Sequence, residues 1–116
     1  MAQIEYPLKG KDFSYQLNGD EVTIGRDAHA DIRLRFDPRV SHIHCRVVHT
    51  PDGYVVHDNG SRNGTKVNDK RIRRKGVLLH HGDSIKIGHT VLHFHTDHSP
   101  AGILHRIEAL LHLKEA

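Results

Sequence analysis

Residues 40–65 read VSHIHCRVVHTPDGYVVHDNGSRNGT, and this stretch decides the fold. It contains two short runs of mixed apolar and polar residues, 45–48 and 54–57, which the turn-forming sequence Pro51-Asp52-Gly53 separates. Successive side chains of a β-strand point to opposite faces, so short runs of this kind bounded by turn residues are typical of strands. The stretch therefore predicts short strands joined by tight turns.

The same arrangement continues outward in both directions. Further strand-like runs occupy residues 13–17, 21–24, 84–87 and 91–94. Turn-forming sequences lie between them at 18–20, 58–60, 63–64 and 81–83. Many short strands at such spacing indicate an antiparallel sandwich or barrel.

A helical pattern begins only near residue 99. Ser99 can cap a helix, Pro100 suits its first turn, and apolar residues then recur at helical spacing up to Leu111. We expect a domain over residues 1–98 and an amphipathic helix over 99–116. This helix either docks on the sandwich or begins a connection to a further domain.

Length and composition limit the possible classes of protein. A chain of 116 residues corresponds to one domain, and no apolar run approaches the roughly 20 residues that cross a bilayer. The N-terminus lacks the pattern of a secretory signal and Cys45 is the single cysteine, so we expect a cytoplasmic protein without an internal disulfide. The net charge of +3, with many basic residues between Lys70 and Lys75, favours an acidic or phosphorylated partner.

Four short motifs stand out, and three of them fall in loops, where binding residues concentrate. They are Gly25-Arg26, the sequence from Ser41 to His44, Asn63-Gly64-Thr65, and Gly82-Asp83 before a late strand. In this order and at these separations the chain resembles the forkhead-associated (FHA) domain over roughly residues 4–96. The resemblance implies an all-β fold, an antiparallel β-sandwich of about 10–11 short strands, and a module that binds phosphothreonine-containing protein segments without cofactors or catalysis.

The resemblance implies that Arg26 and Ser41 hold the phosphate, and their chemistry suits that role. A phosphothreonine carries about −1.5 to −2 charges at neutral pH and three acceptor oxygens. An arginine offers a planar fork of donors and remains charged, and a serine adds a short hydroxyl donor. Backbone N–H groups of the same loop can complete the phosphate site.

Five other residues have expected roles, and the resemblance implies those of Asn63 and His44. Asn63 matches the asparagine that binds the ligand main chain, and its amide can both donate and accept. Arg62 is expected either to add a cation near the phosphate or to meet acidic residues beside the phosphothreonine. His44 is expected to fix the loops by hydrogen bonding, Gly25 to allow a close backbone approach or an unusual dihedral angle, and Gly64 to form a turn.

The chain departs from the family pattern at two places. His42 follows Ser41 where the family often has a basic residue or asparagine, so we expect it to contact the phosphate and to make binding pH-sensitive. Asn68-Asp69 stands where the family commonly has Asn-Gly, and it can still form the hairpin turn, although less easily.

Other functions remain as alternatives. One is an FHA-fold interaction module that binds without phosphate, and another is nucleic-acid binding through the basic hairpin, although aromatic residues for base stacking are few. The pairs His42/His44 and His93/His95 raise the question of a metal, but we expect none. Ser41 lacks the Gly-x-Ser-x-Gly frame of a hydrolase, and no nucleotide-binding loop is present, so neither an enzyme nor a small-molecule substrate is expected.

Overall fold

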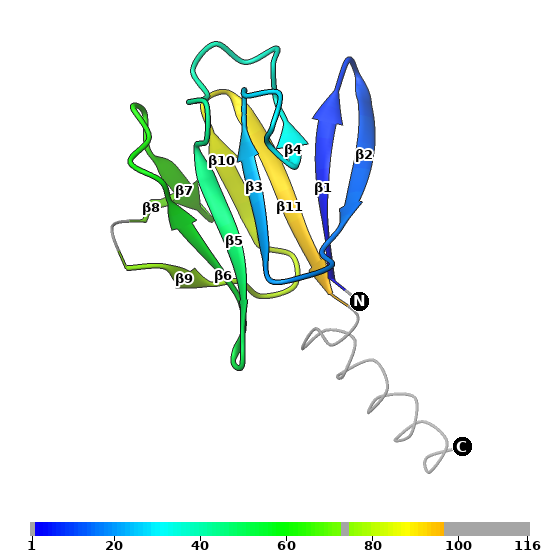
Figure 1. Ribbon diagram of the computed structural model, residues 1–116, viewed down its shortest axis with the longest axis vertical. Helices are drawn as coiled ribbons and strands as arrows, with labels where there is room; N and C mark the ends of the chain where they lie inside the picture. Colours follow the sequence, from blue (N-terminus) through cyan, green and yellow to red (C-terminus); the bar gives the residue numbers. More distant parts are fainter. Residues whose placement is uncertain (1, 73–74, 97–116) are drawn as a thin grey trace, which may run out of the picture.

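The computed structural model describes residues 2–72 and 75–96 and shows a two-layer β-sandwich (Figure 1). One sheet has the order β2-β1-β11-β10-β7-β8 and the other the order β4-β3-β5-β6-β9. The strands are β1 (Ala2–Leu8), β2 (Lys11–Gln16), β3 (Glu21–Gly25), β4 (Ile32–Arg33), β5 (Cys45–Thr50), β6 (Gly53–Asp58), β7 (Thr65–Val67), β8 (Lys70–Arg71), β9 (Val77–Leu78), β10 (Ser84–Ile87) and β11 (Thr90–Thr96). The predicted all-β sandwich is confirmed. The predicted helix at 99–116 and the boundary at residue 98 lie outside the described residues.

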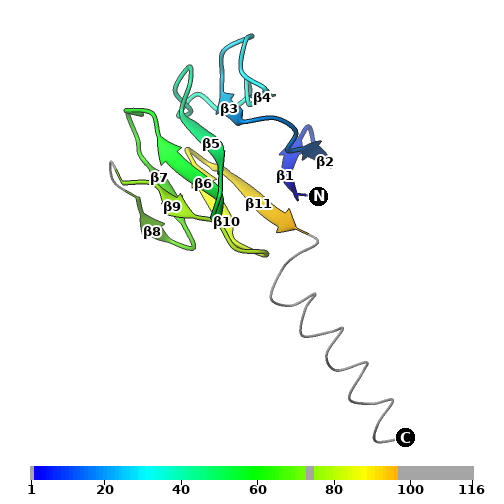
Figure 2. The same ribbon diagram turned by 60° about the horizontal axis from the view of Figure 1, so that its bottom comes forward.

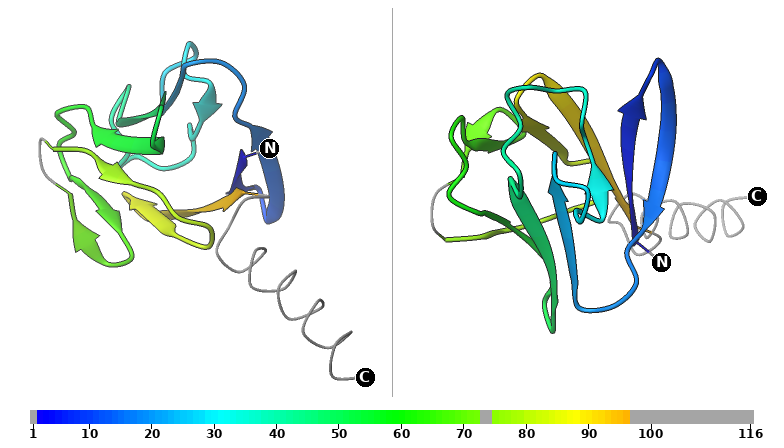
Figure 3. Two further views of the ribbon diagram at one scale, coloured as in Figure 1. Left: turned by 90° about the horizontal axis from the view of Figure 1, so that it is seen from below. Right: turned by 45° about the horizontal axis from the view of Figure 1, so that its top comes forward.

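The two sheets form two layers, which Figure 3 (left) shows from below, and the buried side chains of the core come from both of them. In β1, β5, β7, β10 and β11, buried residues alternate with more exposed neighbours, which is the alternation that a half-buried strand requires. Truncating such aliphatic residues to alanine typically costs about 2–5 kcal/mol of folding free energy. The largest fully buried side chains from both sheets include Ile4, Ile24, Val47, Val56, Ile85, Ile87, Leu92 and Phe94. In the described part of the chain, no helix has the length and apolar character needed to span a membrane.

One strand pair differs from the predicted antiparallel pattern. β4 pairs in parallel with β3, with Ile24 opposite Ile32 and Gly25 opposite Arg33. Side chains support this edge, because the Asp31 carboxylate accepts from the Thr23 N–H at 2.8 Å and the Asp31 N–H donates to the Thr23 hydroxyl at 3.1 Å. These hydrogen bonds form only when the two segments meet in the folded chain, so the strand propensity of the sequence could not predict them.

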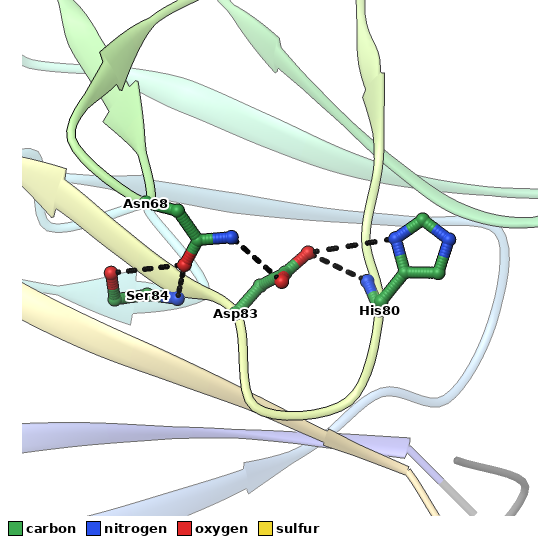
Figure 4. A network of polar contacts seen from close by, with 4 residues as sticks. All are labelled: Asn68, His80, Asp83 and Ser84. Atoms are coloured by element: carbon green, nitrogen blue, oxygen red, sulfur yellow. Dashed lines mark hydrogen bonds and ion pairs between the residues drawn. The ribbon is translucent and has the colours of Figure 1, made fainter. Parts of the chain in front are cut away.

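The Asn68-Asp69 turn adopts the hairpin geometry that its sequence allowed. Both residues have positive φ, 49° and 68°, as a two-residue type I′ turn requires. The Asn68 amide also donates to Asp83 at 2.8 Å and accepts from the Ser84 N–H at 3.0 Å, while Asp83 accepts from the His80 N–H (Figure 4). These bonds join the β7–β8 turn to the turn before β10.

The loops after β3, β4 and β6 lie together at one end of the sandwich, together with the β10–β11 turn (Figures 1 and 2). Two hydrogen bonds connect loops that are distant in sequence: the His89 N–H donates to Asp37 at 2.7 Å, and the Asn63 amide donates to the Arg39 carbonyl at 2.8 Å. The Asn68 turn lies at the opposite end. The fold therefore places most of the sequence motifs at one end of the sandwich.

Candidate functional site

An open hollow of about 260 Å³ lies among these loops, and we call it the first hollow. All five residues predicted to contact a ligand line it, although they come from three separate loops. The loop 34–44 supplies three further lining residues, Pro38, Arg39 and Val40. The full lining is Arg26, Pro38, Arg39, Val40, Ser41, His42, Arg62 and Asn63.

Gly25 brings the first two loops into contact. A Cβ atom at this position would lie 2.0 Å from the carbonyl oxygen of His42 and 2.9 Å from Cα of Ile43, and both are backbone atoms. The close approach lets the Arg26 N–H donate to the Ser41 carbonyl at 3.1 Å and the Asp27 N–H donate to the His42 carbonyl at 3.0 Å. Of the two roles considered for Gly25, the geometry shows the close approach, because its φ is not positive.

His44 is fully buried and links the second loop to the third. Its Nδ1 accepts a hydrogen bond from the Ser41 N–H at 3.1 Å, so its Nε2 carries the proton and donates to the Gly64 carbonyl at 2.8 Å. Both ring nitrogens are therefore used inside the protein. Gly64, with φ of 83°, supplies a turn that places its carbonyl there.

Arg26 and Ser41 are both partly buried and held in fixed positions. The Arg26 Nε donates to the Val40 carbonyl, which leaves the two terminal nitrogens of the guanidinium available. The Ser41 Oγ accepts from the Arg62 N–H at 3.1 Å, so the hydroxyl hydrogen remains free to donate elsewhere. A cationic fork and a hydroxyl donor thus line the same hollow.

Asn63 is exposed at the rim of the first hollow. Because its Nδ2 donates to the Arg39 carbonyl at 2.8 Å, its orientation is fixed and Oδ1 is left to accept a further hydrogen bond. Arg62 and His42 are exposed beside it, and both line the hollow. An extended main chain crossing this rim would meet one oriented amide and two basic side chains.

Asp58 organises the third loop, although no sequence motif pointed to this role. Its carboxylate accepts from the Ser61 N–H at 2.9 Å, from the Ser61 hydroxyl, and from the buried Thr65 hydroxyl at 2.7 Å. Burial raises the pKa of Asp58, but the hydrogen bonds from Ser61 and Thr65 outweigh it and leave this pKa below its ordinary value. An aspartate three residues before a serine is the turn signal that could have revealed it.

Asp37 plays a similar part in the loop 34–44 and was also missed. It is 7% exposed, and its carboxylate accepts from the Arg39 N–H at 3.0 Å, the His89 N–H at 2.7 Å and the Thr90 hydroxyl at 2.7 Å. These bonds fasten the loop to the β10–β11 turn. The sequence around Asp37 did not indicate its contact with residues 89–90, because these residues are more than fifty positions away.

A second hollow, also of about 260 Å³, adjoins the first and shares Arg39 and Asn63 with it. Lys66 of β7, Lys86 of β10 and His89 of the β10–β11 turn also line it. Its other lining residues are Gly64 and Gly88. The predicted basic run at 70–75 contributes no residue to either hollow among its described members, although the Arg71 guanidinium packs against Gly64.

The two histidine pairs considered for metal binding occupy different environments. His42 is exposed in the first hollow, whereas both ring nitrogens of His44 are engaged in the interior. His93 and His95 lie on β11 with ring centroids 6.5 Å apart, and His95 Nε2 lies 3.9 Å from the Glu5 carboxylate. Within residues 2–72 and 75–96, no group of three or more potential ligands is arranged to hold a metal ion.

A family pattern and a related protein both point to the same family. The sequence pattern of the FHA domain matches residues 22–88. Over 82 residues the chain is 42% identical to human angiogenic factor with G patch and FHA domains 1; the match covers 64% of this chain and 12% of that protein. The chain thus spans only a small part of the length of this relative.

Solved structures agree with this match. The FhaA FHA domain, crystallised in complex with the intracellular domain of Rv3910, superimposes with a TM-score of 0.72 at 29% identity, covering 81% of this chain and 99% of that one. Mycobacterium tuberculosis EmbR in complex with a low-affinity phosphopeptide gives 0.71 at 33% identity, with 81% and 24% covered. The chain therefore belongs to the forkhead-associated family of phosphothreonine-binding signalling modules.

Proposed function

We propose that the first hollow binds the phosphate of a phosphothreonine in a partner protein, with Arg26 and Ser41 as its principal ligands. The observation that carries the proposal is that a half-buried guanidinium and a hydroxyl donor line one hollow. Hydrogen bonds within the protein, from Arg26 Nε to the Val40 carbonyl and from the Arg62 N–H to Ser41 Oγ, hold both side chains in place. Groups held in place before the ligand arrives lose less conformational entropy on binding.

The charge of the site matches the charge of the ligand. Arg26 and Arg62 are permanent cations, and His42 adds a basic group at the same hollow. A phosphate ester with about two negative charges and three acceptor oxygens can meet the Arg26 fork and the Ser41 hydroxyl together. A glutamate in its place has one charge and two oxygens, so it should bind much more weakly.

Asn63 is proposed to hold the ligand main chain. Its Oδ1 can accept from a ligand N–H, because its amide nitrogen is bound to the Arg39 carbonyl. This contact does not depend on the ligand side chains, so it contributes affinity rather than selectivity. His44, Gly25 and Gly64 act indirectly, by fixing the loops that carry the contact residues.

The related complexes support a phosphorylated protein segment as the partner. EmbR has been solved in complex with a phosphopeptide, and the FhaA FHA domain has been crystallised with the intracellular domain of another protein. The chain would accordingly act as a binding module in a signalling pathway that uses threonine phosphorylation, without catalysing a reaction itself.

An oriented phosphothreonine peptide library, with the matching unphosphorylated library, tests the proposal. Wild-type protein should select phosphorylated peptides, and calorimetric titration should show binding that Arg26→Ala reduces by about a hundredfold or more, since a charge-assisted bidentate contact is lost. Arg46→Ala is the matched control, because Arg46 pairs with Glu21 on the sheet surface and lines neither hollow. Equal affinity for phosphorylated and unphosphorylated peptides would refute the proposal.

A further inference from the structure

The two sheets have four edges, and β2 forms the longest of them. The edge strands β4, β8 and β9 have two residues each, whereas β2 has six, Lys11–Gln16. Figure 1 shows β2 at the outer margin of the sandwich, with no described strand beyond it. A long edge strand presents a row of unpaired N–H and C=O groups, on which another strand can pair.

Alternate residues of β2 direct their backbone groups away from β1. The N–H of Leu17, the residue after the strand, donates to the Ala2 carbonyl at 2.9 Å, and this bond shows which residues pair with β1. Hydrogen-bonded and non-hydrogen-bonded pairs alternate along an antiparallel ladder. The residues whose backbone groups point outward are therefore Asp12, Ser14 and Gln16.

β2 lacks most of the features by which proteins protect an edge strand. Its register with β1 is continuous from the pair Gln3–Gln16 to the pair Leu8–Lys11, so it has no bulge, and it contains no proline. Its two charged residues, Lys11 and Asp12, are adjacent at one end and have opposite signs. Charged side chains, prolines and bulges are the usual means of preventing pairing between edges. The centre of this edge is therefore open to another strand.

Aromatic side chains lie on one face of β2. Phe13 is 42% exposed, and its ring stacks on that of Tyr6 in β1 with the ring centroids 6.0 Å apart. Tyr15 lies on the same face as Phe13, because residues two apart in a strand point the same way. Aromatic pairs across neighbouring strands stabilise a sheet, so a partner strand with aromatic residues on this face would fit best.

A second copy of β2 meets both requirements when the two strands run antiparallel about a twofold axis at Ser14. The opposed pairs between the two copies are then Ser14 with Ser14, Asp12 with Gln16, and Phe13 with Tyr15. This register uses every residue of β2 whose backbone groups point outward. It places no like charges opposite each other and forms two aromatic pairs.

The register centred on Ser14 is better than the neighbouring one centred on Phe13. In the latter, Gln16 would oppose the β1–β2 turn, and only Asp12 and Ser14 would pair within the strands. The Gln16 carbonyl already accepts from the Asn18 N–H at 3.0 Å, but a carbonyl oxygen has a second lone pair for the partner strand. The register centred on Ser14 therefore makes more hydrogen bonds.

We propose that this chain forms a weak symmetric dimer in which β2 pairs with β2 of a second copy, centred on Ser14. A twofold axis makes both copies use the same surface, as the self-complementary edge requires. Antiparallel pairing directs the site-bearing loops of the two copies to opposite ends. If the proposed function holds, one dimer would therefore bind two phosphothreonine segments at once.

Sedimentation equilibrium of the full chain tests the proposal. One pair of strands buries less area than a stable interface needs, so we expect dimers at concentrations of about 0.1–1 mM. The mass should rise from 13.2 kDa toward twice that value. A chain that remains monomeric at about 1 mM overturns the proposal and leaves β2 free for a strand of another protein.

Cysteine cross-linking tests the register. The Cα atoms of a hydrogen-bonded antiparallel pair lie about 5.5 Å apart, which a disulfide can span. Ser14→Cys should therefore form a covalent dimer with oxidised glutathione. Asp12→Cys is the matched control, because Asp12 is equally exposed but lies about 13 Å or more from its equivalent in the other copy. Cys45 is buried and supplies no competing thiol. Equal cross-linking of the two variants overturns the proposed pairing.

Charge reversal at the twofold axis gives an independent test. Ser14→Lys and Ser14→Glu should each dimerise about fivefold or more weakly than wild type, because like charges then oppose each other. An equimolar mixture of the two should dimerise at least as well as wild type. Ser14 is exposed, so both variants should melt near the wild-type temperature. A dimer that is as strong in Ser14→Lys as in wild type places the interface elsewhere and overturns the proposal.

These results are independent of the proposed function. Ser14 lines neither hollow, so Ser14→Lys should bind a phosphothreonine peptide with wild-type affinity per site. Loss of the dimer with binding retained would show that the two properties are separate. A chain that dimerises through β2 but does not select phosphothreonine would refute the proposed function and leave the dimer established.

Discussion

The imidazole of His44 accepts a hydrogen bond from the backbone N–H of Ser41 at 3.1 Å, and the same ring donates to the Gly64 carbonyl at 2.8 Å. The ring is fully buried and thus joins the loop that carries Ser41 to the loop that carries Asn63. One interior side chain sets the relative position of two parts of the site without reaching the ligand.

Replacing His44 with alanine should therefore reduce both stability and binding. The substitution leaves the Ser41 N–H and the Gly64 carbonyl without partners, and each unsatisfied buried group costs about 1–3 kcal/mol. We expect denaturant titration to show this loss, and phosphopeptide affinity to fall even where the variant is folded. The exposed His93→Ala is the control, and equal behaviour of the two variants would contradict the linking role.

Gly25→Ala should distort the site directly. The added methyl group would lie 2.0 Å from the His42 carbonyl oxygen, so the loop carrying Ser41 and His42 must move. We expect a loss of at least about 2 kcal/mol in unfolding free energy and a large fall in affinity. Gly19→Ala has open space around it and φ of 89°, so it should cost only about 1 kcal/mol and leave affinity unchanged.

Asp37 should make the fold sensitive to acid. Burial raises its pKa, but hydrogen bonds from Thr90, Arg39 and His89 outweigh burial and hold the pKa below the ordinary value. A carboxyl group whose pKa is lower in the folded state stabilises the protein above its unfolded-state pKa of about 3.9, and this contribution disappears as pH falls through the folded-state pKa.

We therefore expect Asp37→Asn to reduce the unfolding free energy by about 1–3 kcal/mol at pH 7. The side-chain NH₂ group of the asparagine would face an N–H or O–H donor that the carboxylate now accepts from, so at least one hydrogen bond is lost. The difference from wild type should begin to shrink below about pH 4, where the carboxyl group of Asp37 gains a proton in the unfolded chain while it is still charged in the folded protein. Denaturant titrations of both proteins from pH 3 to 7 measure this difference in unfolding free energy. A difference that is constant across this range would show that the charge of Asp37 is unimportant.

Asn63 should tolerate alanine better than aspartate. Asn63→Ala removes the proposed main-chain contact and should weaken all phosphopeptides by a similar factor, about five- to tenfold. Asn63→Asp loses the donor to the Arg39 carbonyl and places a negative charge beside the phosphate, so binding should fall further. An aspartate variant that binds as well as the alanine variant would argue against this geometry.

His42 should give binding a shallow optimum near pH 6–7. An imidazole gains charge as pH falls, whereas the phosphate, with a second pKa of about 6, loses charge over the same interval. His42 lines the first hollow, so His42→Ala should flatten the profile measured by titration from pH 5 to 8. Superimposable profiles for the two proteins would exclude His42 from the phosphate contacts.

Much of the fold was accessible from sequence. The alternating runs predicted six strands that the structure contains: β2, β3, β5, β6, β10 and β11. The seven-residue strand β1 and the shorter strand β7 were not predicted. The strands β4, β8 and β9 were also missed, because they have two residues each and two residues carry no periodicity. Their positions depend on contacts such as that between Asp31 and Thr23, which form only after the chain has folded.

The sequence by itself determined the family and the sandwich, and it pointed to Arg26, Ser41 and Asn63 as the proposed ligand contacts, because motif order and turn chemistry are local properties of the chain. Only the tertiary structure showed that Asp37 fastens one loop to the β10–β11 turn and that Lys66 faces Lys86 across two strands. Both relationships join residues far apart in the chain, and the register between strands, rather than any local preference, decides which of them meet.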